Sequence, residues 1–182
     1  MSRVAPLIAA LALAAGPVAA DDLARSLDAA RTAYDAGDLQ AALEELDNAR
    51  EHIQTARAER LAAFLPAPRD GWERTVNLSP ADPIGGIAVS GIYSDEGTTF
   101  TLTLVADSPL ITGFAGMMRD AGLMTQMGQI RVIDEKVFID NGGELTTVVG
   151  DRVLVQAGGA TPTQMSHHLA AMDFDALAGF GS

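Results

Sequence analysis

Few residues in this chain could carry out catalysis. The histidines are His52, His167 and His168. A catalytic triad needs one histidine held between a nucleophile and a carboxylate. His167 and His168 follow Ser166, but successive helix residues point about 100° apart and cannot easily share a site. The sequence also lacks a glycine-flanked serine elbow, a phosphate-binding loop and a dinucleotide fingerprint. We predict no catalytic residues. An enzyme would need a deep cleft that brings together at least two of four side chains. These are His52, His167, Asp173 and Asp175.

Methionine is concentrated in the C-terminal half, at positions 117, 118, 124, 127, 165 and 172. Because the chain has no cysteine, thioether and imidazole groups are the soft ligands left for Cu(I). Met124 and Met127 are three residues apart on an expected helix, and with His167 and His168 they form a candidate copper site. The alternative is that flexible, apolar methionine fills gaps between helices and a sheet. Both interpretations stay open, and we predict no bound cofactor.

The charge of the chain excludes one class of partner. The net charge is −12, and Lys136 is the only lysine. Nucleic-acid binding needs clustered basic side chains, so we exclude it. The longest apolar stretch after the N-terminus, residues 110–127, carries Arg119 and Asp120 in its middle, so we expect no membrane span. The acidic pairs Asp95-Glu96 and Asp134-Glu135 fall in predicted turns, where we expect solvated carboxylates.

Residues 1–20 have the pattern of a secretory signal peptide. Arg3 precedes an apolar run, Gly16-Pro17 breaks it, and Val18-Ala19-Ala20 places small residues before a cleavage site. The run is shorter than the roughly 20 residues that a membrane span needs. We therefore expect a mature chain that starts at Asp21 and is periplasmic or secreted. Without cysteine, neither a lipid anchor nor a disulfide is expected.

Residues 21–65 read as a helical hairpin. Apolar residues recur at helical spacing on both sides of Gly37, and Asp38 is placed to cap a second helix. Pro66 and Pro68 should end this unit, which gives a linker at 66–71. The hairpin resembles a single tetratricopeptide-repeat unit, with matching residues Ala30, Tyr34, Gly37-Asp38, Ala42, Leu46 and Ala49. Because there is no second copy, no repeat array is expected.

Residues 72–182 read as an α+β domain. The predicted strands are 87–93, 98–105, 129–133, 136–139, 144–149 and 152–156, and the predicted helices begin near Pro109 and Pro162. The order ββαββββα predicts a two-layer domain, an antiparallel sheet with two helices over one face. Trp72 follows proline and glycine just after the hairpin. The chain resembles in this respect a family of exported proteobacterial proteins, and that resemblance implies a fold and a compartment but no activity.

The function class that these observations favour is a non-enzymatic exported protein that binds a protein partner or associates with itself. The expected partner surface is the apolar stripe Leu39, Leu43, Leu46 and Ile53. The alternative is a protein that binds Cu(I) or a small apolar ligand with its methionine-rich helices. A cavity of roughly 300 Å³ or more between sheet and helices would favour ligand binding, and a filled core would favour the interaction role.

Overall fold

The computed structural model describes residues 17–80 and 85–181, so most of the predicted signal peptide lies outside the described residues. The chain divides into two compact units, residues 1–52 and 53–182. The first unit contains α1 (Pro17–Asp35) and the first part of α2 (Leu39–Ala62). The predicted linker at 66–71 does not coincide with this boundary, which falls inside α2.

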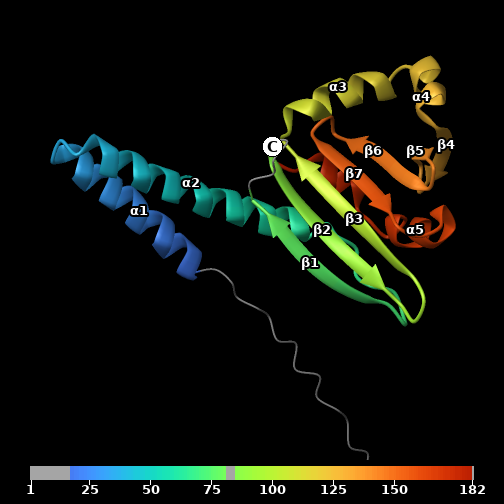
Figure 1. The fold of residues 1–182 in the computed structure, drawn as a ribbon, viewed down its shortest axis with the longest axis horizontal. Coiled ribbons are helices and arrows are strands. Elements are labelled where there is room, and N and C mark those ends of the chain that lie inside the picture. Colours follow the sequence, from blue (N-terminus) through green and yellow to red (C-terminus); the bar gives the residue numbers. More distant parts are fainter. Residues whose placement is uncertain (1–16, 81–84, 182) are drawn as a thin grey trace, which may run out of the picture. The chain divides into compact units, whose positions relative to one another are not determined.

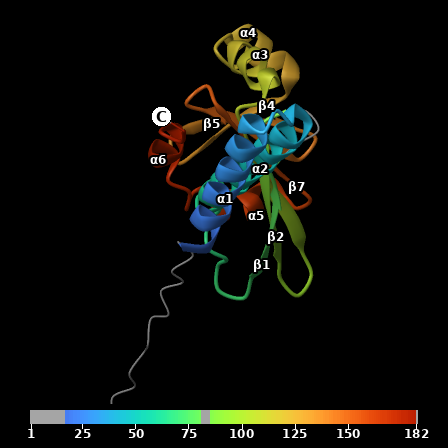
Figure 2. The ribbon, with the colours of Figure 1, turned by 90° about the vertical axis from the view of Figure 1, so that its left-hand side faces the viewer.

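The helical hairpin is present as predicted, and α1 runs alongside α2 in Figures 1 and 2. Gly37 has φ +80°, a left-handed conformation that glycine adopts without a steric cost. The Asp38 carboxylate then accepts a hydrogen bond from the backbone N–H of Ala41 at 3.1 Å and caps α2. The first helix begins at Pro17, earlier than the sequence pattern indicated.

The second unit is built on one seven-stranded antiparallel sheet with the strand order β1-β2-β3-β7-β6-β5-β4 (Figure 1). The strands are β1 (Glu73–Ser79), β2 (Ile87–Ser94), β3 (Thr99–Ala106), β4 (Gln129–Ile133), β5 (Lys136–Asn141), β6 (Glu144–Val149) and β7 (Val153–Gly158). The α+β class and the six predicted strands are confirmed within one or two residues. Two-residue turns at Asp134-Glu135 and Gly142-Gly143, all with positive φ, fix the registers of β4–β5 and β5–β6.

Strand β1 was not predicted. It pairs with β2 at one edge of the sheet, and none of its residues is buried. Val76 and Leu78 do alternate with polar residues in the sequence, but two apolar positions in an exposed edge strand are a weaker signal than the patterns that identified the other strands.

The helices differ from the prediction in number and placement. The expected helix at 110–127 is two helices, α3 (Pro109–Met118) and α4 (Ala121–Met127), because Asp120 accepts hydrogen bonds from the N–H groups of Gly122 and Leu123 and starts a new helix. The last helix is also divided, into α5 (Pro162–Leu169) and α6 (Phe174–Ala178), since Asp173 caps α6.

The sheet carries helices on both faces, so the expectation that two helices cover one face is wrong, while the predicted α+β class stands. The main core combines Leu102, Leu104 and Val155 of the sheet with Met165 and Leu169 of α5. On the opposite face, Ile111 of α3 packs with Ala88 and Val105. The alternation of side chains along β3 assigns neighbouring residues to these two separate clusters.

The C-terminal end of α2 belongs to the main core. Ala58 and Leu61 are fully buried and Leu65 is nearly so. The carbonyl of Pro66 accepts hydrogen bonds from the Tyr93 hydroxyl at 2.7 Å and from the Arg74 guanidinium at 2.8 Å. The carbonyl of Leu65 accepts a second bond from Arg74 at 2.7 Å. These contacts make residues 53–65 part of the sheet unit.

Candidate functional site

The hairpin unit buries small side chains and exposes large ones. Ser26, Ala30, Ala42 and Ala49 are its buried residues, and small side chains allow two helices to approach closely. The positions that carried the tetratricopeptide-like pattern therefore include three buried alanines, while Tyr34 of that pattern is exposed. Leu27 of α1 is exposed as well.

The predicted partner surface is accessible to solvent. Leu39, Leu43, Leu46 and Ile53 are between 46 and 60% exposed. Their spacing of four, three and seven residues places them along one stripe of α2, which we call the leucine stripe. Ile53 is the first residue of the sheet unit, and the other three belong to the hairpin unit.

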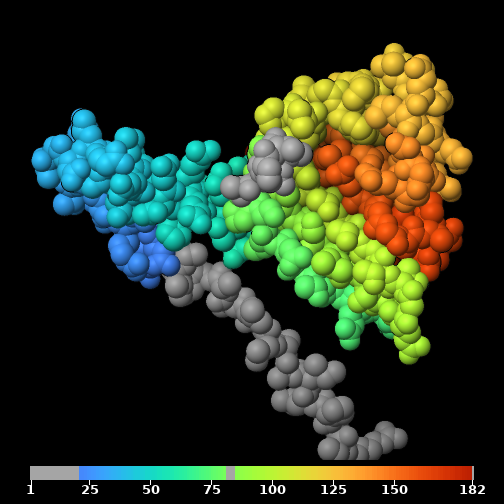
Figure 3. Space-filling view, in the orientation of Figure 1, coloured from blue at the N-terminus to red at the C-terminus, as the bar shows by residue number. Residues whose placement is uncertain are grey.

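A cavity of about 400 Å³ lies between α3 and the sheet. Its floor includes Val105 of β3 and Leu154 of β7, which are paired across the two strands. Ile111, Phe114 and Met117, three residues apart along α3, line its other side, and Figure 3 shows the yellow atoms of α3 next to the orange atoms of β6 and β7. The remaining lining residues are Ser108, Leu110, Gly113 and Gln156. We call this space the α3 cavity. Its volume exceeds the roughly 300 Å³ at which a cavity favours ligand binding.

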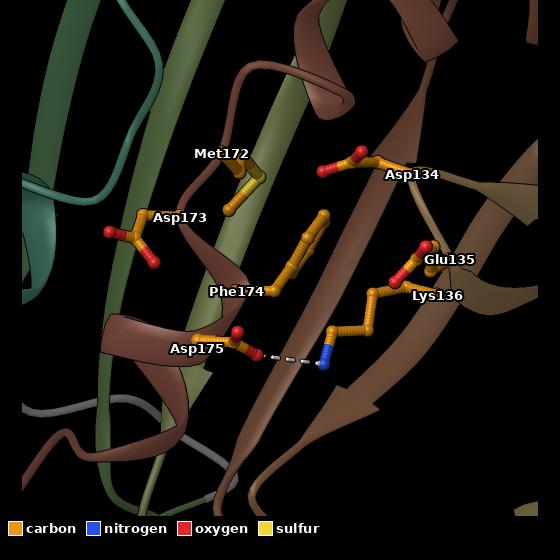
Figure 4. A pocket seen from close by; sticks show the side chains of 7 residues that line it. All are labelled: Asp134, Glu135, Lys136, Met172, Asp173, Phe174 and Asp175. Atoms are coloured by element: carbon orange, nitrogen blue, oxygen red, sulfur yellow. Dashed lines mark hydrogen bonds and ion pairs between the residues drawn. The ribbon is translucent and has the colours of Figure 1, made fainter.

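A second cavity, of about 430 Å³, lies between the β4–β5 turn and the start of α6 (Figure 4). Asp134, Glu135 and Lys136 line one side, and the segment Met172–Asp175 lines the other. The Lys136 ammonium lies 3.4 Å from Asp175 Oδ1, and the Asp175 side chain is 98% exposed. Because an ion pair this open to water is screened, it contributes little to stability.

This second cavity brings together two of the four side chains named for a catalytic cleft, Asp173 and Asp175. Asp173 Oδ1 accepts the N–H of Ala176 at 2.8 Å, so this carboxylate is engaged in capping α6. No histidine is among the seven lining residues. Asp134 and Glu135 occupy a turn, as predicted, and the arrangement is an open acidic surface rather than a paired acid and base.

The candidate copper ligands are not brought together. Met127 lies on the α3 side of the sheet, near Phe114 and Gln156. His168 packs on the other side, against Tyr93 and Phe100 of the main core. Met165 and Met172 are buried in that core, which supports the packing interpretation for them. Within residues 17–80 and 85–181, no group of three or more histidine and acidic side chains could hold a metal ion.

His168 is the residue whose surroundings the sequence analysis missed. Its side chain is 1% exposed, and its ring centroid lies 4.9 Å from those of Trp72 and Tyr93 and 5.0 Å from that of Phe100. Neither ring nitrogen has a hydrogen-bond partner of normal geometry. Burial lowers the pKa of His168, the Gln164 carbonyl opposes this shift, and the charges of Arg69 and His167 add to it. The sequence does contain a sign of this burial, because His168 lies three residues after Met165 on the same apolar stripe of α5.

Asp107 is the centre of a charged cluster in the sheet unit. Its carboxylate pairs with Arg57 of α2 and accepts hydrogen bonds from Arg152 at 2.6 and 3.2 Å. Arg152 also donates to the Gly181 carbonyl at 2.9 Å. Burial alone would raise the pKa of Asp107, but the hydrogen bonds and charges of Arg152 and Arg57 outweigh it and lower the pKa. This cluster ties α2, the end of β3 and the C-terminal segment together.

Comparisons of the chain with protein-family models, with curated proteins and with solved structures find no match. The resemblances drawn from the sequence therefore stay predictions. In the part of the chain that the structure describes, no helix is long and apolar enough to cross a membrane.

Proposed function

We propose that this protein is an exported, non-enzymatic binding protein that captures a protein partner through the leucine stripe. The observation that carries the proposal is the burial pattern of the hairpin: Ala30, Ala42 and Ala49 are buried. Leu39, Leu43 and Leu46 are exposed instead. Large exposed apolar side chains in a row are typical of surfaces that are covered by a partner.

The charge of the hairpin favours one kind of partner. Residues 21–52 carry nine acidic side chains and three arginines. Two copies of such a surface would repel each other, whereas a segment with apolar residues flanked by lysine or arginine would be attracted. We therefore propose an amphipathic, basic helix of another protein as the partner, with self-association as the alternative outcome.

The double variant Leu43→Ser, Leu46→Ser tests this proposal. We expect the wild-type protein to bind a basic amphipathic helical peptide in fluorescence anisotropy, and the double variant to lose that binding. Val132→Ser is the matched control, because Val132 is an apolar side chain exposed to 67% on β4 of the sheet unit. Equal binding by the double variant and the wild type would refute the proposal, and sedimentation velocity would report self-association.

Export is tested separately. If residues 1–20 are a cleaved signal, fractionation of cells that express the full chain should recover the protein in the periplasm or the medium, and N-terminal sequencing should begin at Asp21. Recovery of the intact chain in the cytoplasmic fraction would contradict this part of the proposal. The binding proposal would be unaffected, because it rests on residues of the hairpin.

A second candidate function is the binding of a small apolar ligand. The specific observation in its favour is the α3 cavity, whose volume of about 400 Å³ falls in the range of small-molecule sites. It lies between the sheet and α3, as a ligand site between sheet and helices requires. The two functions use different surfaces and are compatible.

A further inference from the structure

The α3 cavity has the composition of a site for an uncharged molecule. None of its nine lining residues carries a charge, and its polar side chains are the hydroxyl of Ser108 and the amide of Gln156. A charged group placed there would lose part of its hydration without gaining a counter-charge from the lining. An apolar molecule with one neutral polar group would match the lining.

Gly113 gives the cavity a feature that packing does not require. It lies in the middle of α3, where glycine lowers helix stability relative to alanine. A β-carbon at this position would meet no atom within 4 Å, so the backbone does not need glycine for space. Because Gly113 lines the cavity, a larger side chain there would project into it. Glycine at this position therefore leaves this part of the lining without a side chain.

The other lining residues of α3 can adjust to a guest. The helix buries only Ile111 and Ala115 in the protein, while Leu110 and Met117 are exposed at the cavity. Methionine has three rotatable bonds and adapts to irregular shapes. The floor, in contrast, belongs to β3 and β7, each of which pairs with a neighbouring strand on both sides. Adaptable α3 side chains facing two central strands are suited to binding flexible apolar molecules.

We propose that the α3 cavity binds an uncharged, elongated apolar molecule with a single neutral polar group, such as a medium-chain alcohol. The proposal rests on the second candidate function and names its ligand class. An apolar cavity of about 150 Å³ holds benzene, so a space of about 400 Å³ accommodates a molecule somewhat more than twice that size. The chain of the molecule lies between Phe114 and Leu154, and its polar group lies near Ser108 or Gln156.

The test uses the full mature chain and phenylnaphthylamine, an uncharged dye whose fluorescence rises when it leaves water. We expect saturable binding to one site and displacement of the dye by octanol. Octanoate, which has a chain of the same length and a negative charge at neutral pH, should compete at least about tenfold more weakly. Absence of saturable dye binding would overturn the site. Equal competition by octanoate and octanol would overturn the ligand class.

Gly113→Leu and Gly116→Leu form a matched pair of variants. Both positions are glycines of α3 with open space around them, but only Gly113 lines the cavity. Gly113→Leu should weaken dye binding by about tenfold or more, whereas Gly116→Leu should leave it within about twofold. Equal effects of the two variants, or no effect of Gly113→Leu, would overturn the proposal. Urea unfolding of each variant shows that the protein is folded.

The hairpin variants separate this proposal from the proposed capture of a protein. Leu43→Ser, Leu46→Ser should abolish peptide binding and leave dye binding unchanged. Gly113→Leu should do the reverse. Loss of dye binding in the hairpin double variant would place the dye on the leucine stripe and overturn the α3 cavity as its site.

Discussion

The imidazole ring of His168 lies 4.9 Å from the indole ring of Trp72, centroid to centroid, at an angle of 69°. Tyr93 and Phe100 lie at similar distances, and Tyr93 stacks on Phe100. The environment is aromatic on several sides, and both imidazole nitrogens lack hydrogen-bond partners of normal geometry. Such a histidine is held neutral, because a buried charge without a partner is costly.

The first prediction concerns the pH dependence of stability. Because the pKa of His168 is lowered in the folded protein, the unfolded chain takes up the proton first as the pH falls. The contribution of neutral His168 to the free energy of unfolding is therefore fully present above the ordinary histidine pKa of about 6.5. Below that pH the free energy of unfolding decreases, by up to about 1.4 kcal/mol per pH unit. Urea unfolding followed by Trp72 fluorescence at about pH 7.5 and about pH 5.5 measures this change.

The matched variants for that prediction are His168→Leu and His167→Leu. His168→Leu should remove the decrease and stabilise the protein at neutral pH, since two unsatisfied polar atoms leave the core. His167 is exposed, so its replacement should leave the decrease in place. A wild-type stability that does not change over this pH range would contradict the prediction.

A second prediction compares two aspartates that both have positive φ and both pair with arginine. Asp107 is partly buried between Arg57 and Arg152, whereas Asp151 pairs with Arg119 in an exposed position. Asparagine tolerates the same backbone conformation. Asp107→Asn should lower the free energy of unfolding by about 1–3 kcal/mol, and Asp151→Asn should change it by less than about 1 kcal/mol.

The effect of Asp107→Asn should also depend on pH. The lowered pKa of Asp107 means that its contribution is present above the ordinary aspartate pKa of about 3.9 and is lost as the pH falls through the folded value. The difference between wild type and variant, measured by urea unfolding, should therefore shrink in strong acid. Equal destabilisation by both asparagine variants at neutral pH would refute this account.

A third prediction tests the alanine interface of the hairpin. Ala30→Leu should destabilise the hairpin by about 1–3 kcal/mol, because a buried position between closely approaching helices cannot hold a larger side chain. Ala24→Leu, at an exposed position of the same helix, should have little effect. Hydrogen exchange of the α1 amides in the full chain reports this unit directly. Faster exchange in both variants would argue against a close alanine contact.

The fourth prediction concerns the boundary of the sheet unit. A chain that starts at Ile53 should fold, whereas one that starts at Trp72 should not, because it lacks Ala58, Leu61 and Leu65 of the core. Leu61→Ala in the full chain should cost about 2–5 kcal/mol, the usual loss for a fully buried leucine. Circular dichroism and urea unfolding measure both effects. A cooperative transition in the shorter chain would instead support a boundary at the predicted linker, residues 66–71.

Much of the fold follows from local patterns. Alternating residues identified β3, glycine-rich turns identified the β5–β6 connection, and Asp38 marked the start of α2. Two kinds of element were missed. β1 marks its alternation with only two apolar residues, Val76 and Leu78, and the caps at Asp120 and Asp173 interrupt stripes of apolar residues that continue across them. Apolar periodicity is therefore a weak signal for an exposed edge strand and does not detect a break within a continuing apolar stripe.

For the candidate sites too, some features follow from the sequence and others only from the tertiary structure. The sequence alone determined the spacing of the leucine stripe along one helix and the absence of cysteine chemistry. The tertiary structure decided the rest. It separated Met127 from His168 by the sheet, enclosed His168 among Trp72, Tyr93 and Phe100, and formed the α3 cavity by pairing Val105 with Leu154. Those relationships join residues tens of positions apart, and local periodicity contains no information on which distant strands pair or which face a helix covers.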